Sequence, residues 1–197
     1  MMGFARVAAL LLGACVPALV AAEPATIGPF NTDIAAGGTP YVAQIGAPGT
    51  NLPATQSWAL RAWVDPRIVP SGTVTVAGVG APGAGLFLAL VDGAPALVTP
   101  AGIVKGGGKL PSGKWTFLAA TADKGTAHLF VNGVEVASGS AGAAQLSSQA
   151  RLGGDGFGGR VAGFGYAGQA LSAADVQKAA SRAPDPALTV FTLSSPT

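Results

Sequence analysis

Few residues in this sequence could carry out catalysis, and they stand far apart along the chain. Glutamate occurs only at Glu23 and Glu135, and the single histidine is His128. Hydrolysis of a glycosidic bond uses two carboxyl groups that flank the bond. A serine hydrolase of the G-x-S-x-G type needs a turn that this sequence lacks, and one histidine cannot supply the ligands of a catalytic zinc site. The sequence therefore predicts that the protein is not an enzyme.

Calcium is the one cofactor for which the sequence offers ligands. Hard cations bind oxygen atoms, and Asn31, Asp33 and Asp155 fall in stretches that we expect to be loops. No D-x-D-x-D-G run joins these residues, so Asp33 and Asp155 are weak candidates for metal ligands. The G-x-G-x-x-G pattern occurs three times, but it never leads from a strand into a helix, as dinucleotide binding requires. We therefore expect no cofactor other than calcium.

Aromatic and polar side chains on two expected strands suit binding better than catalysis. In the stretch 58–65 (WALRAWVD), Arg61 and Trp63 alternate with apolar residues and so lie on the opposite face of a strand. His128 and Phe130 alternate with leucine and valine in the same way in a later strand. If the two strands share a sheet, one face carries all four side chains. Such a face could bind a flat sugar ring or an apolar anchor of a protein partner.

The alternative, which we favour for this face, is that it forms a second core layer covered by the long N-terminal segment. Trp63 would then be buried. The binding surface would have to lie on the expected loops at Asn31–Asp33 and Gly153–Gly159. The burial of Trp63 distinguishes these two interpretations.

The elements that position these residues are short strands separated by turn signals. Strand patterns occur at 41–45, 58–65, 73–79, 85–91, 94–99, 114–123, 126–132, 134–138, 160–166 and 188–193. Asp92-Gly93 and Asn132-Gly133 predict two-residue type I′ turns, and Asp123-Lys124-Gly125 predicts a slightly longer one. One helix is predicted, from a capping-box-like start at Ser172 to a stop at Pro184. The pattern is typical of an all-β antiparallel sandwich with one short C-terminal helix.

Five segments within residues 57–178 follow one another in a specific order. They read WALRAWVDP, GKWTFLAATAD, HLFVNGVEVASG, RLGG and FGGRVAGFGYAGQALSAADV. In this order they resemble the laminin G-like, concanavalin A-like lectin/glucanase jelly-roll family. The resemblance implies a jelly roll whose tight hairpins hold neighbouring strands of one sheet. The E-x-D-x-E pattern of the glucanases in that family is absent here. The fold alone does not determine function, because it hosts lectins, hydrolases and adhesion modules.

The first residues resemble a signal peptide. Residues 1–6 carry one positive charge, an apolar stretch follows, and small residues precede Glu23. We expect a signal peptide at 1–22, an N-terminal segment joining the sandwich at 23–56, and the jelly-roll domain at 57–197. Cleavage after Ala22 would give a secreted or periplasmic protein. The alternative is a membrane-anchored lipoprotein, because the residues up to Cys15 (LGAC) resemble a lipobox.

Charge is sparse and scattered in this sequence. The chain has 11 Lys and Arg against 9 Asp and Glu, and charged residues make up 10% of it. Without a basic stripe we expect no nucleic-acid partner, and no apolar run after residue 22 is long enough to cross a membrane. The sequence predicts an exported, non-catalytic module whose partner is a glycan or an extracellular protein, with a glycan as the leading ligand. The alternative is a structural or protein-interaction domain, or an accessory domain of a larger exported enzyme.

Overall fold

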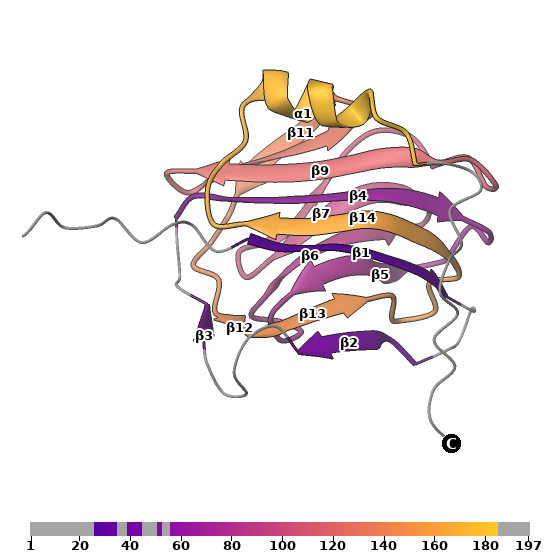
Figure 1. The fold of residues 1–197 in the computed structure, drawn as a ribbon, viewed down its shortest axis with the longest axis horizontal. Coiled ribbons are helices and arrows are strands. Elements are labelled where there is room, and N and C mark those ends of the chain that lie inside the picture. The colour runs from indigo at the N-terminus through magenta and orange to yellow at the C-terminus, as the bar shows by residue number, and fades with distance from the viewer. Residues whose placement is uncertain (1–25, 35–38, 45–50, 53–55, 185–197) are drawn as a thin grey trace, which may run out of the picture.

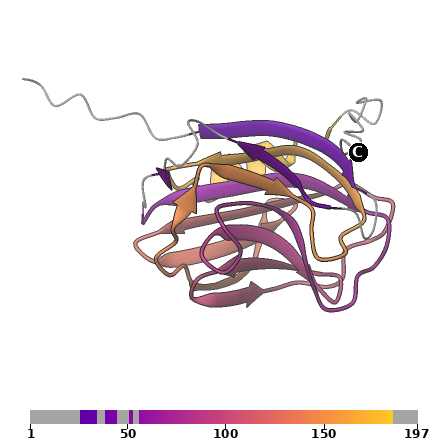
Figure 2. The ribbon, with the colours of Figure 1, turned by 90° about the horizontal axis from the view of Figure 1, so that it is seen from below.

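The described part of the chain folds into two six-stranded antiparallel sheets that pack face to face (Figures 1 and 2). The computed structural model describes residues 26–34, 39–44, 51–52 and 56–184. The first sheet has the order β1 (Thr26–Ile34), β14 (Gly159–Ala167), β4 (Trp58–Pro66), β9 (Thr116–Asp123), β10 (Thr126–Val131) and β11 (Val134–Ser140). The second has the order β2 (Tyr41–Gln44), β13 (Gln149–Leu152), β5 (Thr73–Val79), β6 (Leu86–Val91), β7 (Ala94–Thr99) and β8 (Gly102–Lys105). A short separate ladder joins β3 (Asn51–Leu52) to β12 (Leu146–Ser147). This arrangement confirms the predicted all-β sandwich.

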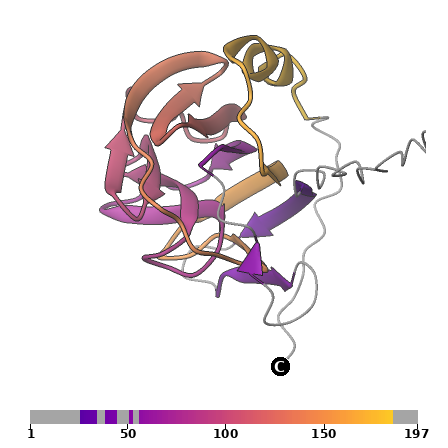
Figure 3. The ribbon, with the colours of Figure 1, turned by 90° about the vertical axis from the view of Figure 1, so that its left-hand side faces the viewer.

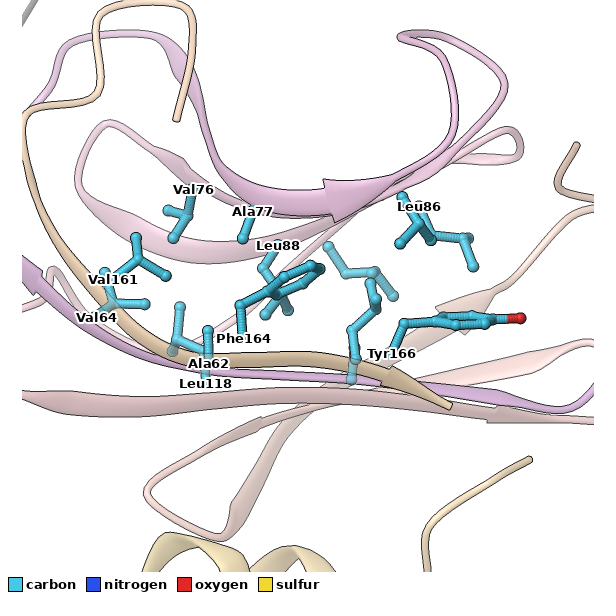
Figure 4. Close-up of a cluster of buried hydrophobic side chains, with 14 of the residues drawn as sticks. Ala62, Val64, Val76, Ala77, Leu86, Leu88, Leu118, Val161, Phe164 and Tyr166 are labelled. Atoms are coloured by element: carbon cyan, nitrogen blue, oxygen red, sulfur yellow. The ribbon is translucent and has the colours of Figure 1, made fainter. Parts of the chain in front are cut away.

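The hydrophobic core lies between the two sheets. On β4, Leu60 and Val64 point inward and are fully buried, as the alternation of the sequence predicts. Figure 4 shows Phe164 of β14 between the two sheets, with Leu88 of β6 on the opposite side. Full burial of a Leu, Val or Phe side chain contributes roughly 1.5–3 kcal/mol relative to exposure. The inner faces therefore hold the sandwich together, and the side chains of the outer faces do not belong to this core.

The N-terminal segment contains more strand than the sequence predicts. Only residues 41–45 were expected to form a strand there, and β2 confirms it. The expectation of loop for residues 26–34 is wrong, because they form β1 and pair with β14 along the edge of the first sheet. Gly28 and Pro29 are turn signals, but an edge strand tolerates them because one of its sides needs no partner. The pairing register shifts at this point of β1. The expected strand at 188–193 and the expected signal peptide lie outside the described residues.

The three tight turns that the sequence predicts each connect neighbouring strands. Asp92 and Gly93 have φ of 52° and 84°, and Asn132 and Gly133 have φ of 49° and 83°. These positive values confirm the two predicted type I′ turns. The third turn is shorter than predicted: Asp123 already pairs with Thr126, so Lys124 and Gly125 alone form it, with φ of 50° and 85°.

A single helix among the described residues packs on the outer face of the first sheet (Figures 1 and 3). This is α1 (Ala173–Ala180), and its N-cap is Ser172, as predicted. The hydroxyl of Ser172 accepts a hydrogen bond from the backbone N–H of Asp175 at 3.2 Å and donates one to its carboxylate at 2.6 Å. The side chain of Val176 is fully buried against β9 and β10. No helix in the described ranges has both the length and the hydropathy needed to cross a membrane.

Candidate functional site

A groove of about 590 Å³ lies between α1 and the outer face of the first sheet. Its floor consists of strand residues from three neighbouring strands, β14, β4 and β9. Its wall consists of residues from α1 and from the chain on either side of it. The lining residues are Arg61, Trp63, Phe117, Ala162, Gly163, Leu171, Asp175, Lys178, Ala179, Arg182 and Pro184. The groove therefore depends on both the sheet and the helix.

An aromatic pair forms the floor of the groove. Trp63 of β4 and Phe117 of β9 are direct neighbours in the register of the two strands. Their ring centroids are 5.3 Å apart, with an interplanar angle of 57°. Tilted aromatic pairs at this distance attract each other through their quadrupoles. Phe117 is buried, whereas Trp63 is only partly buried, so its indole ring is the part of the pair that a ligand can reach.

Small residues on β14 keep the ring of Trp63 accessible from one side. Ala162 is the register partner of Trp63, and a bulge in β14 follows it. Gly163 lies in this bulge with φ of 61°, a conformation that glycine adopts without strain. A Cβ atom added at Gly163 would lie 3.9 Å from Cδ1 of Trp63. The bulge and the missing side chain together leave open space beside the indole.

The helix supplies polar groups to the wall of the groove. Asp175, Lys178, Ala179 and Arg182 are spaced at three and four residues, so they share one side of the helix and its C-terminal extension. Lys178 and Arg182 are exposed cations, and Asp175 is the one carboxylate among the described residues that line the groove. This carboxylate already accepts the hydrogen bond from Ser172.

The structure separates the four side chains expected to form one binding face. Arg61 and Trp63 line the groove together. Phe130 lies on the same outer face, but it is 4% exposed and packs beneath Val176 of α1. His128 does not line the groove, and its Nδ1 lies 2.8 Å from Oε1 of Glu135. The candidate set therefore reduces to Arg61 and Trp63 as groove residues.

The expectation that the N-terminal segment covers this outer face is wrong. We expected the N-terminal segment to bury Trp63 in a second core layer. Instead, β1 extends the sheet at its edge, and α1 covers Phe130 and part of Phe117 from above. An edge strand satisfies its backbone groups by pairing sideways, so it does not lie over the face. Trp63 is consequently only partly buried, so the favoured expectation of a buried Trp63 is wrong, and its partial exposure agrees with the alternative of an open face.

The structure places the two candidate metal ligands in a turn and in an edge strand. Asp155 lies in a turn with φ of 55°, and its Oδ2 accepts a hydrogen bond from the hydroxyl of Thr75 at 2.8 Å. Asp33 lies in β1 opposite Arg160, rather than in the expected loop. Among the described residues, no three His, Cys, Asp or Glu side chains lie close enough together to hold a metal ion. Calcium binding stays a prediction.

Sequence reasoning missed the residues on the wall and the glycine on the floor. The residue patterns of the sequence give no role to Lys178, Arg182 or Gly163. The helical spacing of 175, 178, 179 and 182 could have identified a common side. The sequence does not indicate which strands that side faces, since a helix can pack on either sheet.

The family follows from the match to known sequences. Residues 36–177 match the model described as the concanavalin A-like lectin/glucanases superfamily. The chain belongs to this superfamily. The match confirms the resemblance seen in the five sequence segments. No curated protein sequence matches the chain.

Solved structures of this superfamily fold share the architecture of the chain. One of them is domain 4 of AbnA, an extracellular arabinanase from Geobacillus stearothermophilus, which was solved in complex with arabinotriose. Its sequence is 26% identical to this chain, and the two structures superpose with a TM-score of 0.50 over 76% of this chain and 86% of that domain. A sialidase from Trypanosoma rangeli is 19% identical at a TM-score of 0.52, over 63% of this chain. A structure of botulinum neurotoxin type C, whose cell entry depends on two ganglioside molecules, is 11% identical at a TM-score of 0.51, over 64% of this chain. The chain spans only 22% of the sialidase and 35% of the neurotoxin structure, so these two show the fold alone.

Proposed function

We propose that this protein is an exported, non-catalytic module that binds carbohydrate in the groove between α1 and the first sheet. The observation that carries the proposal is the partly buried Trp63, which lies beside Arg61 in that groove. An indole ring offers a flat apolar surface to the C–H face of a sugar ring, while a guanidinium donates hydrogen bonds to its hydroxyl groups. Pockets for small ligands commonly combine an apolar floor with a few polar groups and have volumes of about 300–1,000 Å³.

The composition of the groove supports binding rather than hydrolysis. A glycosidase with the usual mechanism needs two carboxyl groups, about 5–10 Å apart. Among the described residues the groove offers only Asp175, and the Ser172 hydroxyl already donates to that carboxylate. The arabinanase domain with bound arabinotriose supports a sugar ligand for a module of this size, because this chain covers 86% of that domain.

The test is a glycan array probed with the full exported chain, followed by calorimetric titration of the best ligands. Trp63→Ala should lower the affinity at least about tenfold, since the indole provides the stacking surface. His128→Ala is the matched control, because His128 lies on the same outer face but outside the groove. Equal affinity of the Trp63→Ala variant and the unaltered chain would refute this site.

Export is the second part of the proposal, and it depends on residues 1–22 of the sequence. Mass spectrometry of the protein recovered outside the cytoplasm should find Glu23 at its N-terminus. A lipid-modified Cys15 at the N-terminus would show a membrane-anchored protein instead. An intact Met1 would contradict export.

An accessory role in a larger enzyme is the second candidate function. It is favoured by the extent of the structural matches, since the chain corresponds to one domain of the arabinanase and to 22% of the sialidase. In that case the module would hold a partner enzyme near a polysaccharide. Joining the chain to a hydrolase that acts on the bound polysaccharide should then raise the rate on polymeric substrate and leave the rate on short oligosaccharides unchanged.

A further inference from the structure

Three cations gather around the groove without a partner among the described residues. Arg61 extends from the floor, and Lys178 and Arg182 belong to the wall. All three are exposed, and none of them makes an ion pair or a side-chain hydrogen bond within the described part of the chain. Asp175, the one carboxylate among the described residues of the groove, accepts a hydrogen bond from Ser172. Among the described residues, the groove therefore carries three cations against one anion.

This concentration of charge stands out because the protein carries so little charge elsewhere. Charged residues make up only 10% of the sequence. Two side-chain pairs are already formed on the first sheet: the guanidinium of Arg160 with the carboxylate of Asp65, and Nδ1 of His128 with Oε1 of Glu135. Unpaired cations on both sides of one small groove favour an anionic ligand, because each of them can still form a charge-assisted hydrogen bond.

We propose that the groove selects short saccharides that carry a carboxylate, such as oligosaccharides containing uronic acid. The inference rests on the proposed function, since it names the class of sugar for the same site. A pyranose ring would stack on Trp63. The guanidinium of Arg61 would bind the carboxylate, and Lys178 and Arg182 would approach it from the wall of the groove.

The position of Arg61 makes it the first ligand for the carboxylate. Residues two apart on a strand point to the same face and lie about 6–7 Å from each other. A sugar ring on the indole of Trp63 therefore brings a substituent within reach of Arg61. A planar carboxylate can accept two parallel hydrogen bonds from a guanidinium, which a neutral hydroxyl cannot do. The small volume, about 590 Å³, favours a saccharide of a few rings over a face of a folded protein.

The test compares each acidic oligosaccharide with its own methyl ester, which has the same rings and no charge. The full chain is titrated with an uronate oligosaccharide and with its ester, at low and at high salt, and with a sulfated oligosaccharide as a third probe. We expect the free acid to bind about tenfold tighter than the ester at low salt, and the difference to shrink as salt screens the cations. A sulfated probe that binds tightly while the uronate binds no better than its ester would overturn the choice of a carboxylate.

Variants that remove a positive charge test whether the preference for the free acid arises in the groove. Lys178→Gln and Arg182→Gln should each reduce the preference for the free acid by about threefold and leave binding of the ester unchanged. Lys105→Gln is the matched control, because Lys105 is an exposed cation on β8 of the other sheet, outside the groove. A preference that survives in the triple variant Arg61→Gln, Lys178→Gln and Arg182→Gln would overturn the inference.

The failures of the two proposals can be told apart. If neutral and acidic saccharides bind equally, and Trp63→Ala abolishes both, carbohydrate binding stands and the preference for acids is overturned. If no saccharide binds and an Asp- and Glu-rich peptide binds in a Trp63-dependent way, both proposals are overturned in favour of a protein ligand. If the chain binds neither class, both proposals fail.

Discussion

Two arginine and tryptophan pairs on the same outer face have opposite environments. At one end of β4, the guanidinium of Arg160 lies 4.8 Å from the ring centre of Trp115 and donates from Nε to Oδ2 of Asp65 at 2.9 Å. Trp63 and Arg61, which precede Asp65 on β4, line the groove, and no carboxylate of the described residues forms an ion pair with Arg61. The presence of one carboxylate, Asp65, separates the two cases. It shows that residue type alone does not distinguish a structural cluster from a binding surface.

The energetics of the two pairs should differ accordingly. Asp65 is 1% exposed, so its carboxylate has lost nearly all contact with water and depends on Arg160. The cluster is not fully satisfied, because Oδ1 of Asp65 and Nε1 of Trp115 are buried without a hydrogen-bond partner. Arg61 is exposed, so water stabilises its charge until a ligand replaces that water. The first pair stabilises the fold, and the second remains available for binding.

The largest effect on stability is expected from removing the guanidinium of Arg160, which is paired with Asp65. Arg160→Ala should lower the free energy of unfolding by about 3–5 kcal/mol, because it leaves the buried carboxylate of Asp65 without a counter-charge. Arg61→Ala is the matched control and should change it by less than about 0.5 kcal/mol, as is usual for an exposed side chain. Urea denaturation measures both. Similar losses in the two variants would mean that the distinction between the pairs is incorrect.

A smaller effect on stability is expected from a substitution in the turn at Asn132-Gly133, which lies against α1 at the wall of the groove. Gly133→Val places a branched side chain at a φ of 83°, and its Cβ would lie 3.1 Å from Cα of Gln177 in α1. Gly125→Val introduces the same strain at a φ of 85°, with no atom within 4 Å of the new Cβ. We expect about 1–3 kcal/mol of destabilisation from strain in both variants. Only Gly133→Val should also displace α1 and weaken saccharide binding.

Calorimetric titration of the two turn variants provides the check. The Trp115, Asp65 and Arg160 cluster contains no residue of α1, so it should be intact in both variants. Loss of binding in the Gly125→Val variant to the same extent would show that the groove does not depend on the position of α1.

The smallest effect on stability is expected from a substitution at Gly163, on the floor of the groove. Gly163→Ala adds a methyl group next to Cδ1 of Trp63, at an ordinary contact distance of 3.9 Å, and places it at a φ of 61°. We expect a stability loss of about 1 kcal/mol from the left-handed backbone conformation. Saccharide affinity should fall by about threefold, because the methyl group narrows access to the indole. Gly72→Ala, at a φ of 72° with open space around it, should show the same stability loss without a change in affinity.

Sequence reasoning predicted the parts of the fold that local patterns determine. The alternation around Leu60 and Val64 reports directly which side chains face the core, because strand side chains alternate with a period of two. The turns at Gly93 and Gly133 were predicted because few residues other than glycine tolerate the required backbone angles. The strand β13 was missed because its four residues are too few to show a period.

The site could be predicted only in part, because it depends on contacts between distant segments. Arg61 and Trp63 were placed on the correct face from their spacing alone. Their separation from Phe130 results from α1, which buries Phe130 and leaves Trp63 partly exposed. The position of the His128 ring depends on its contact with Glu135, which lies seven residues away on the next strand. None of these contacts leaves a local signal in the sequence.

The short length of α1 has a consequence for how the groove behaves over time. A helix of eight residues is not stable alone in water, so α1 keeps its shape through the buried Val176 and the hydrogen bond from the N–H of Leu171 to the hydroxyl of Thr121 at 2.9 Å. Its amides should therefore exchange with solvent deuterium through local opening, at a free energy well below that of global unfolding. A ligand that contacts both the helix and the sheet holds the helix in place. Saccharide binding should thus slow hydrogen exchange in α1 while the amides of the inner strands exchange as before.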